Sequence, residues 1–248
     1  MQIDQLKKIL NEFGESVRFE HDLKKKNWFN IGGKSKVFYK ADNLKDLVNF
    51  LKKLNNKEKI FILGAGSNTL INDNLFDGVV IKLGKNFNNI SLLGEDIIIA
   101  GSSVLDKSLS DFAIQNNLSG FEFLSCIPGT IGGGIRMNAG CFGKEFKDIL
   151  LSIQAVDREG NIKTIKSKDI NFEYRNNDLS EDLIFLSASF KGIKSEAKKI
   201  KIETEKLKIE KAKNQPTKIK TSGSTFKNPV AQTKKKVWEL IKESVNLD

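Results

Sequence analysis

Apolar side chains recur along the chain with two different periods, which predicts helices mixed with strands. Two stretches have the i, i+3, i+4 spacing of amphipathic helices, namely residues 4–13 and a longer run that we expect Asp42 to cap. The apolar face of the longer run consists of Leu44, Leu47, Val48, Leu51 and Leu54. A further helix is expected to begin at Ser102 or Ser103. Residues 194–213 and 234–245 predict two more helices, the first rich in lysine and glutamate.

Short apolar runs alternate with these helices and predict strands. They lie at residues 60–63, 79–83, 97–100 and 183–190. Residues 151–156 and 162–165 flank a turn at 158–161, which predicts a hairpin. Because helices, strands and a hairpin occur in mixed order, we expect an α+β fold and not a doubly wound sheet.

The composition of the chain indicates its localisation in the cell. The hydrophobic fraction of 39% is ordinary for a globular protein, and no run approaches the roughly 20 apolar residues of a membrane span. The N-terminal residues lack the apolar core of a signal peptide. The two cysteines, Cys126 and Cys141, lie in apolar or glycine-rich surroundings. We therefore expect a cytoplasmic protein with reduced thiols and no membrane span.

The net charge of +10 raises the possibility of nucleic-acid binding, but the kind of basic residue that carries the charge argues against such binding. Only four of the 41 basic residues are arginine, the residue that nucleic-acid readers prefer for its planar fork. The chain has a single histidine, His21, and two separated cysteines, which excludes a zinc site and a Ser-His-Asp triad. The chemistry must therefore come from other side chains or from a cofactor.

Residues 64–68 (Gly-Ala-Gly-Ser-Asn) directly follow a predicted buried strand. Glycine lets the backbone approach an anion, and Ser67 and Asn68 add donors, so this segment is a candidate phosphate cradle. It is not a Rossmann fingerprint, because Thr69 follows and no third glycine opens a helix. Taken alone, it is equally compatible with an ordinary turn after a strand.

Residues 127–140 form the most informative segment. Five glycines, at positions 129, 132, 133, 134 and 140, lie within an otherwise apolar stretch. A flexible linker would be polar and rich in serine, which this segment is not. We expect a loop whose backbone wraps closely around a large flat ligand.

Two further segments carry candidate chemistry. Residues 172–176 (Phe-Glu-Tyr-Arg-Asn) contain Arg175, which could equally be a surface arginine lying over aromatic neighbours. Residues 221–229 (Thr-Ser-Gly-Ser-Thr-Phe-Lys-Asn-Pro) taken alone look like a polar turn that ends in proline.

In combination, these segments resemble the motif set of the UDP-N-acetylenolpyruvoylglucosamine reductases. The resemblance runs from Asn27 to Ile241, and its most specific parts are residues 127–143 and 223–229 with Arg175 between them. It implies the vanillyl-alcohol-oxidase/PCMH type of fold, with FAD-binding subdomains at 22–90 and 91–193. A partial α+β substrate-binding domain would follow at 200–248.

The resemblance also implies the roles of individual residues. Residues that would hold noncovalent FAD are Gly64, Ala65, Gly66, Ser67, Asn68, Ile127, Pro128, Gly129, Thr130, Gly132, Gly133, Ile135, Asn138 and Gly140. The implied reaction is the reduction, by NADPH through FAD, of a UDP-sugar enolpyruvyl ether to UDP-N-acetylmuramate. The implied substrate contacts are Lys213, Lys227 and Asn228.

Two catalytic residues follow from the same resemblance, and their chemistry is suitable. Hydride addition leaves enolate-like charge next to the substrate carboxylate, and the fork of Arg175 can hold that charge. The family motif assigns protonation to Ser224. Serine is a weak acid, so this role depends on positioning and on cationic neighbours such as Lys227.

The family continues beyond the 234–245 helix and carries a third catalytic residue there, a glutamate, whereas this chain ends at Asp248. From this difference we expect a truncated form that binds FAD but turns over poorly. The alternatives are an FAD-binding remnant without turnover and another oxidoreductase of the same flavin fold.

Overall fold

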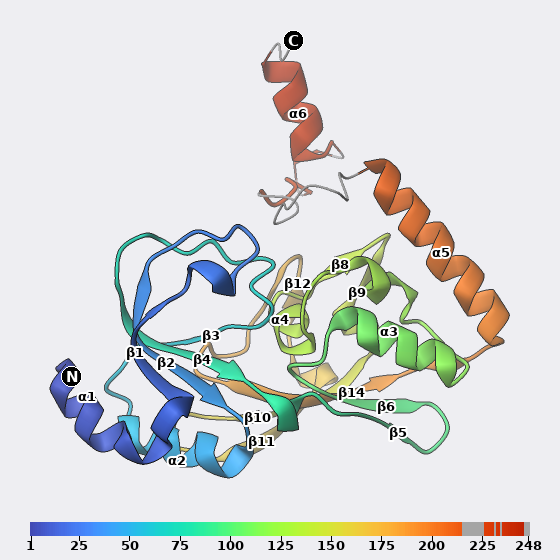
Figure 1. The fold of residues 1–248 in the computed structure, drawn as a ribbon. Coiled ribbons are helices and arrows are strands. Elements are labelled where there is room, and N and C mark those ends of the chain that lie inside the picture. Colours follow the sequence, from blue (N-terminus) through green and yellow to red (C-terminus); the bar gives the residue numbers. More distant parts are fainter. Residues whose placement is uncertain (215–225, 231, 234, 246–248) are drawn as a thin grey trace.

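Two β-sheets with helices packed against them make up most of the fold (Figure 1). The computed structural model describes residues 1–214, 226–230, 232–233 and 235–245. Mixed helices and sheets confirm the predicted α+β class. No helix in these ranges combines the length and the apolar character that crossing a membrane requires.

The first sheet has four strands in the order β1-β2-β4-β3. Their bounds are β1 Val17–Asp22, β2 Lys34–Ala41, β4 Phe76–Leu83 and β3 Ile60–Ile62. β1 is antiparallel to β2, whereas β2 and β3 are both parallel to β4. Helices α1 (Ile3–Leu10) and α2 (Leu44–Leu54) pack their apolar faces on this sheet (Figure 1). The sheet and the two helices enclose the first hydrophobic core, which also takes in Val156, Ile184 and Leu186 from the second sheet.

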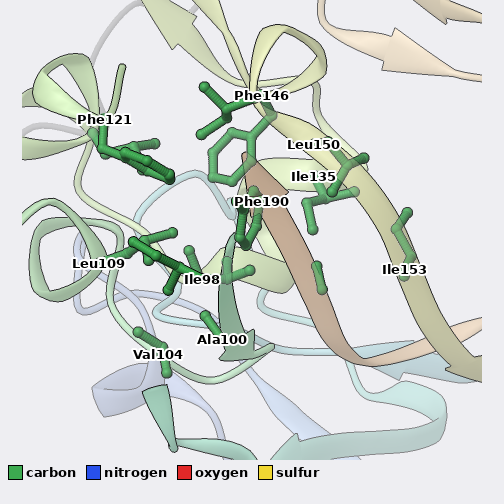
Figure 2. Close-up of a cluster of buried hydrophobic side chains, with 14 of the residues drawn as sticks. Ile98, Ala100, Val104, Leu109, Phe121, Ile135, Phe146, Leu150, Ile153 and Phe190 are labelled. Atoms are coloured by element: carbon green, nitrogen blue, oxygen red, sulfur yellow. The ribbon is translucent and has the colours of Figure 1, made fainter. Parts of the chain in front are cut away.

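The second sheet has five antiparallel strands in the order β11-β10-β14-β6-β5. Their bounds are β11 Ile162–Lys166, β10 Leu150–Val156, β14 Ile184–Lys191, β6 Ile97–Gly101 and β5 Ile90–Leu93. Helices α3 (Asp106–Gln115) and α4 (Ile131–Arg136) pack against it. Figure 2 shows the second core between these elements, where Phe146 and Phe190 lie close together.

Short elements connect and border the two sheets. Three two-stranded ladders join β7 (Leu118–Ser119) to β15 (Ile193–Lys194), β8 (Gly140–Cys141) to β9 (Lys144–Glu145), and β12 (Phe172–Glu173) to β13 (Asn176–Asn177). The 3-10 helices are η1 Asn11–Ser16, η2 Lys24–Lys26, η3 Lys85–Phe87, η4 Glu122–Cys126, η5 Phe146–Asp148 and η6 Ser167–Asp169.

Two helices follow the second sheet. α5 (Ala197–Asn214) packs along η4 and α3 and buries Ile200 and Thr204. α6 (Val237–Ser244) stands apart from the sheets in Figure 1. The predicted subdomain boundaries at 22–90, 91–193 and 200–248 stay predictions. The sharing of the first core between both sheets shows that the two FAD-binding units would not be independent.

The hairpin predicted around residues 158–161 is confirmed by the β10–β11 pairing, and the strand at 183–190 and the helix at 194–213 also form. Two predicted helix starts are wrong. The cap of α2 is Asn43, whose Oδ1 accepts the Asp46 N–H at 2.9 Å, and not Asp42. α3 begins at Asp106 and not at Ser102 or Ser103, because these two serines form a turn that bonds to Leu186 and Phe87 and Leu105 then stays extended to bridge Thr130.

Phe146 provides a test of the second core. It is 0% exposed and packs edge-on against Phe123 and Phe190. We expect Phe146→Ala to lower the free energy of unfolding by about 3–5 kcal/mol, because the ring leaves a cavity. Urea unfolding without added ligand measures this. The matched control is Leu93→Ala on the edge strand β5, where the side chain is 55% exposed and the expected change is about 0.5 kcal/mol or less. Equal losses in both variants would contradict this picture of the core.

Candidate functional site

The first glycine segment, residues 64–68, follows β3 and presents a row of backbone donors. None of its N–H groups donates a hydrogen bond to another described residue. Gly66 has φ +69°, and a Cβ there would lie 2.3 Å from the Lys26 carbonyl oxygen, so only glycine fits. Unpaired N–H groups that converge in a turn form an anion-binding concavity. The geometry therefore suits the phosphate cradle that the sequence predicts.

The second glycine segment lies directly against the first. The Ser67 hydroxyl donates to the Pro128 carbonyl at 2.5 Å, and a Cβ on Gly64 would lie 2.5 Å from Thr130 Oγ1. Thr130 in turn bridges Leu105, which places the start of α3 behind the segment. Residues 64–68 and 128–130, both of which the resemblance assigns to the same cofactor, thus lie side by side.

The local structure of residues 127–140 differs from the predicted loop, because residues 131–136 form helix α4. A Cβ added at Gly132 would lie 3.1 Å from the Cβ of Ser102. A Cβ added at Gly134 would lie 2.3 Å from the Phe146 ring, and one added at Gly140 would lie 2.2 Å from the Lys144 carbonyl oxygen. Close packing within the protein therefore explains these three glycines. Gly133 is the exposed one, with Thr130 Oγ1 3.7 Å from its Cβ position. Of the glycines in α4, Gly133 is the one with room for a ligand.

The remaining predicted cofactor residues divide between surface and core. Pro128 is exposed and Ile127 is half-buried, whereas Ile135 lies within the second core. Asn138 is fully buried with φ +40°. Its Nδ2 donates to Glu145 Oε2 at 2.9 Å and to the Glu173 carbonyl at 3.0 Å, and its Oδ1 accepts the Lys147 N–H at 3.2 Å. These bonds occupy the Asn138 side chain, so it positions the surrounding turns.

Arg175 reaches the end of the second glycine segment. Its Nη2 donates to the Gly140 carbonyl at 2.7 Å and its Nη1 to the Asn138 carbonyl at 3.4 Å. The backbone of Arg175 has φ +59°, a left-handed conformation that is unfavourable for a side chain of this size. Such strain is typical of functional sites, where the surrounding structure enforces it. The structure therefore joins the predicted catalytic cation to the predicted cofactor segment.

The predicted substrate residues are not joined to the glycine segments. Ser224 lies outside the described residues. Lys213 is exposed on α5, where it borders a groove with Ile202 and Ile209, and Lys227 is also exposed. Asn228 Oδ1 accepts the Val237 N–H at 3.0 Å and so caps α6. Among the described hydrogen bonds, none links Lys213, Lys227 or Asn228 to residues 64–68 or 127–140.

Both cysteines are free and lie at the two ends of the second glycine segment, on η4 and β8. The Cys141 thiol donates to the Phe123 carbonyl at 3.3 Å. Interaction with Cys141 lowers the pKa of the Cys126 thiol to about 6, while the same contact and burial raise the pKa of Cys141. The Lys211 amine from α5 donates to the Cys126 carbonyl. The second glycine segment is therefore flanked by a thiol pair and anchored to α5.

Asp106 is a candidate site residue that the sequence does not indicate. Asp106 is fully buried at the start of α3, and neither of its carboxyl oxygens has a hydrogen-bond partner among the described residues. Its Oδ2 lies 2.6 Å from the position that a Cβ on Gly129 would take. Burial raises the pKa of this carboxyl to about 8. An aspartate at the first position of a helix is common, so the sequence carries no signal that it is buried.

Comparison with known proteins adds the family. Residues 35–166, more than half of the chain, match the family of FAD binding domains. A UDP-N-acetylenolpyruvoylglucosamine reductase from Pelagibacter ubique is 64% identical over 248 residues, which cover 100% of this chain and 82% of the relative. The reductase from Rickettsia typhi is 47% identical over 222 residues, covering 90% of this chain and 74% of the relative. The chain belongs to the UDP-N-acetylenolpyruvoylglucosamine reductase family.

Solved structures agree with membership in this reductase family. The structure of UDP-N-acetylenolpyruvylglucosamine reductase from Thermus caldophilus has a TM-score of 0.79 at 27% identity, covering 92% of this chain and 80% of that one. p-Cresol methylhydroxylase has a TM-score of 0.51 at 14% identity, covering 78% and 43%, which shows a shared fold alone. Both likenesses confirm the predicted vanillyl-alcohol-oxidase/PCMH type of fold.

The residues present fit FAD. The diphosphate of FAD is an anion, and residues 64–68 offer unpaired N–H groups with the Ser67 and Asn68 side chains at their end. The exposed backbone at Gly133 leaves room for a close approach beside this cradle. In this reductase, the candidate cofactor site is therefore the seam between residues 64–68 and 128–133.

Neighbouring glycines in α4 provide a matched test of this seam. We expect Gly134→Ala to cost about 1–3 kcal/mol of unfolding free energy, because its Cβ would overlap the Phe146 ring. Gly133→Ala should be neutral or stabilise by up to about 1 kcal/mol, since alanine favours helix. Gly133→Ala should nevertheless weaken FAD binding, measured by quenching of flavin fluorescence. Wild-type FAD affinity in Gly133→Ala would exclude Gly133 from the cofactor site.

Proposed function

We propose that the chain catalyses the NADPH-dependent, FAD-mediated reduction of UDP-N-acetylenolpyruvoylglucosamine to UDP-N-acetylmuramate. Family membership supports this reaction, because the relatives carry the name of the reductase at up to 64% identity. The observation that supports it most directly is the meeting of three predicted segments. Ser67 bonds to Pro128 and Arg175 bonds to Gly140, so the candidate anion cradle and the candidate catalytic cation both contact the second glycine segment, one at each end.

FAD, when bound, supplies the hydride chemistry by accepting a hydride from NADPH and delivering it to the enolpyruvyl double bond. The protein's own contribution is to bind, orient and handle charge and protons. Residues 64–68 bind the diphosphate through their N–H groups, and Gly129 and Thr130 add two more unpaired N–H groups at the seam. The exposed Gly133 has no side chain and would leave the backbone of α4 open to a bound cofactor.

Arg175 holds the negative charge that develops on the substrate side. Two of its five N–H donors bond to the carbonyls of Asn138 and Gly140, which fixes the plane of the guanidinium. The remaining donors are available to a carboxylate or enolate oxygen. Because the guanidinium is fixed before the substrate arrives, little reorganisation is needed when charge develops.

Ser224 donates the proton to the substrate carbon, and Lys227 lies close to it in sequence to support that role electrostatically. Lys213 and Asn228 contact the UDP diphosphate. The location of the reaction is the cytoplasm, where both NADPH and a nucleotide sugar are available as dissolved substrates.

The proposed function is tested by purifying the chain with FAD and following NADPH oxidation at saturating UDP-N-acetylenolpyruvoylglucosamine. We expect a yellow protein whose NADPH oxidation depends on this substrate. If the reduced flavin reacts with oxygen but never with the enolpyruvyl ether, the two alternatives are favoured, namely an FAD-binding remnant without turnover and another oxidoreductase of the same flavin fold. A colourless protein that takes up no FAD would overturn the proposed reductase function and also the alternatives that depend on FAD.

FAD binding is proposed to be noncovalent. His21 lies on β1 against Phe38, away from the second glycine segment, although Cys126 and Cys141 flank that segment. After acid precipitation the flavin should appear in the supernatant. Flavin that stays in the pellet would indicate attachment through one of the thiols.

Arg175→Lys keeps the charge and removes the fork. We expect reoxidation of reduced flavin by the enolpyruvyl substrate to slow by about 10²–10³, comparable to the loss of an oxyanion donor. Flavin reduction by NADPH should be unchanged, since Arg175 acts on the substrate side. Stopped-flow absorbance separates the two half-reactions, and Arg18→Lys on the exposed side of β1 is the matched control. Equal slowing of both half-reactions would show that Arg175 is misassigned.

Ser224→Ala should leave FAD binding intact and stall product formation after hydride transfer, because the substrate carbon then lacks its proton donor. Ser224→Cys, which supplies a stronger acid, should retain part of the activity. Single-turnover experiments in deuterated buffer measure deuterium incorporation into the product. Near-normal turnover by the alanine variant removes Ser224 from the mechanism.

A further inference from the structure

Asp106 is a buried acid at the seam between the two glycine segments. Its side chain is 0% exposed, its backbone N–H donates to the Gly129 carbonyl at 3.2 Å, and its Oδ2 approaches the Cα side of Gly129. Ser67 Oγ lies 3.9 Å from the same Cβ position on Gly129. The Asp106 carboxyl and the Ser67 hydroxyl therefore both lie next to Gly129. Asp106 is therefore packed directly behind the proposed diphosphate site.

No charged partner compensates this carboxyl in the described part of the chain. The side-chain hydroxyls of Ser102, before α3, and of Ser110, one turn further along α3, are likewise buried without a hydrogen-bond partner among the described residues. The nearest charged groups on its own helix, Lys107 and Asp111, pair with each other at 2.5 Å on the exposed face. A buried carboxylate without a countercharge is strongly disfavoured, so the neutral acid is the stable form.

We propose that Asp106 is a positioning residue for the cofactor, held as a neutral carboxylic acid behind the diphosphate site, and that FAD binding is therefore coupled to its protonation. This inference rests on the proposed placement of FAD at the seam. An ionised Asp106 would put a negative charge beside the diphosphate, at a position that is buried away from water. The neutral acid avoids this repulsion and supports the backbone of Gly129.

The sign of the pH dependence follows from linkage. Burial raises the pKa of the Asp106 carboxyl to about 8 without FAD, and a bound diphosphate raises it further. At a pH below the pKa of Asp106 in the free protein, the carboxyl is neutral both with and without FAD. In this range the affinity for FAD does not depend on the ionisation of Asp106. Above pH 8 the free protein loses this proton, so FAD binding requires proton uptake and weakens with rising pH.

The test measures FAD affinity of the full chain, stripped of flavin, from pH 6.5 to 9.5 by flavin fluorescence. For the wild type we expect Kd to be flat at low pH and to rise by up to about tenfold per pH unit above the transition. Asp106→Asn keeps the shape and a donor but cannot ionise, so its Kd should match the wild type at low pH and stay flat. Asp111→Asn, on the exposed face of α3, should keep the wild-type profile. Other titrating groups, such as the Cys126 thiol and FAD itself, act equally in all three proteins.

A second measurement does not depend on a variant that folds. Calorimetry of FAD binding to the wild type in buffers of different ionisation enthalpy counts protons, and we expect none at pH 6.5 and an uptake approaching about one near pH 9. Parallel profiles of wild type and Asp106→Asn, or no proton uptake, would overturn the role of Asp106 while FAD binding itself stands. Loss of FAD binding in Asp106→Asn at every pH, with wild-type folding by circular dichroism, would show that the ionised carboxylate is required. Failure of the wild type to bind FAD at any pH would instead overturn the proposed function.

Discussion

The close approach of two backbone segments, residues 64–68 and 128–130, is the constraint on which the candidate site depends. One segment follows the first sheet and the other precedes α4 on the second, and they meet through the Ser67–Pro128 hydrogen bond. A single added methyl at Gly64 would come within 2.5 Å of Thr130. The candidate anion cradle can approach the segment before α4 this closely because Gly64 lacks a Cβ.

A second constraint acts at the other end of α4. Asn138 and Arg175 both hold left-handed backbone conformations, and the Arg175 guanidinium bonds to the Asn138 and Gly140 carbonyls. The buried amide of Asn138 holds the adjacent turns through Glu145, Lys147 and the Glu173 carbonyl. The guanidinium proposed to hold charge is thus fixed to the same segment that is proposed to face the cofactor.

Much of the secondary structure follows from local pattern. The β10–β11 hairpin, the apolar face of α2 and the long helix α5 appear where periodicity and turn residues predict them. Two of the errors, the start of α3 and the loop expected at 127–140, have a tertiary cause, because contacts between distant segments override local signals. Ser102 and Ser103 form a turn whose N–H groups bond to the Leu186 and Phe87 carbonyls, so α3 begins only after Leu105 has bridged Thr130. Residues 131–136 form a helix in which Gly132 and Gly134 pack closely against Ser102 and Phe146.

The sequence by itself determined the family, the α+β class and the position of the glycine segments, because these depend on residue types and their order along the chain. Only the tertiary structure decided which glycines pack internally and which one is open, that Asn138 is occupied by protein partners, and that Asp106 is buried without a countercharge. These properties depend on distances between residues far apart in the chain. The protonation state of a carboxyl is likewise set by the burial and charges around it, and its neighbours in sequence do not determine it.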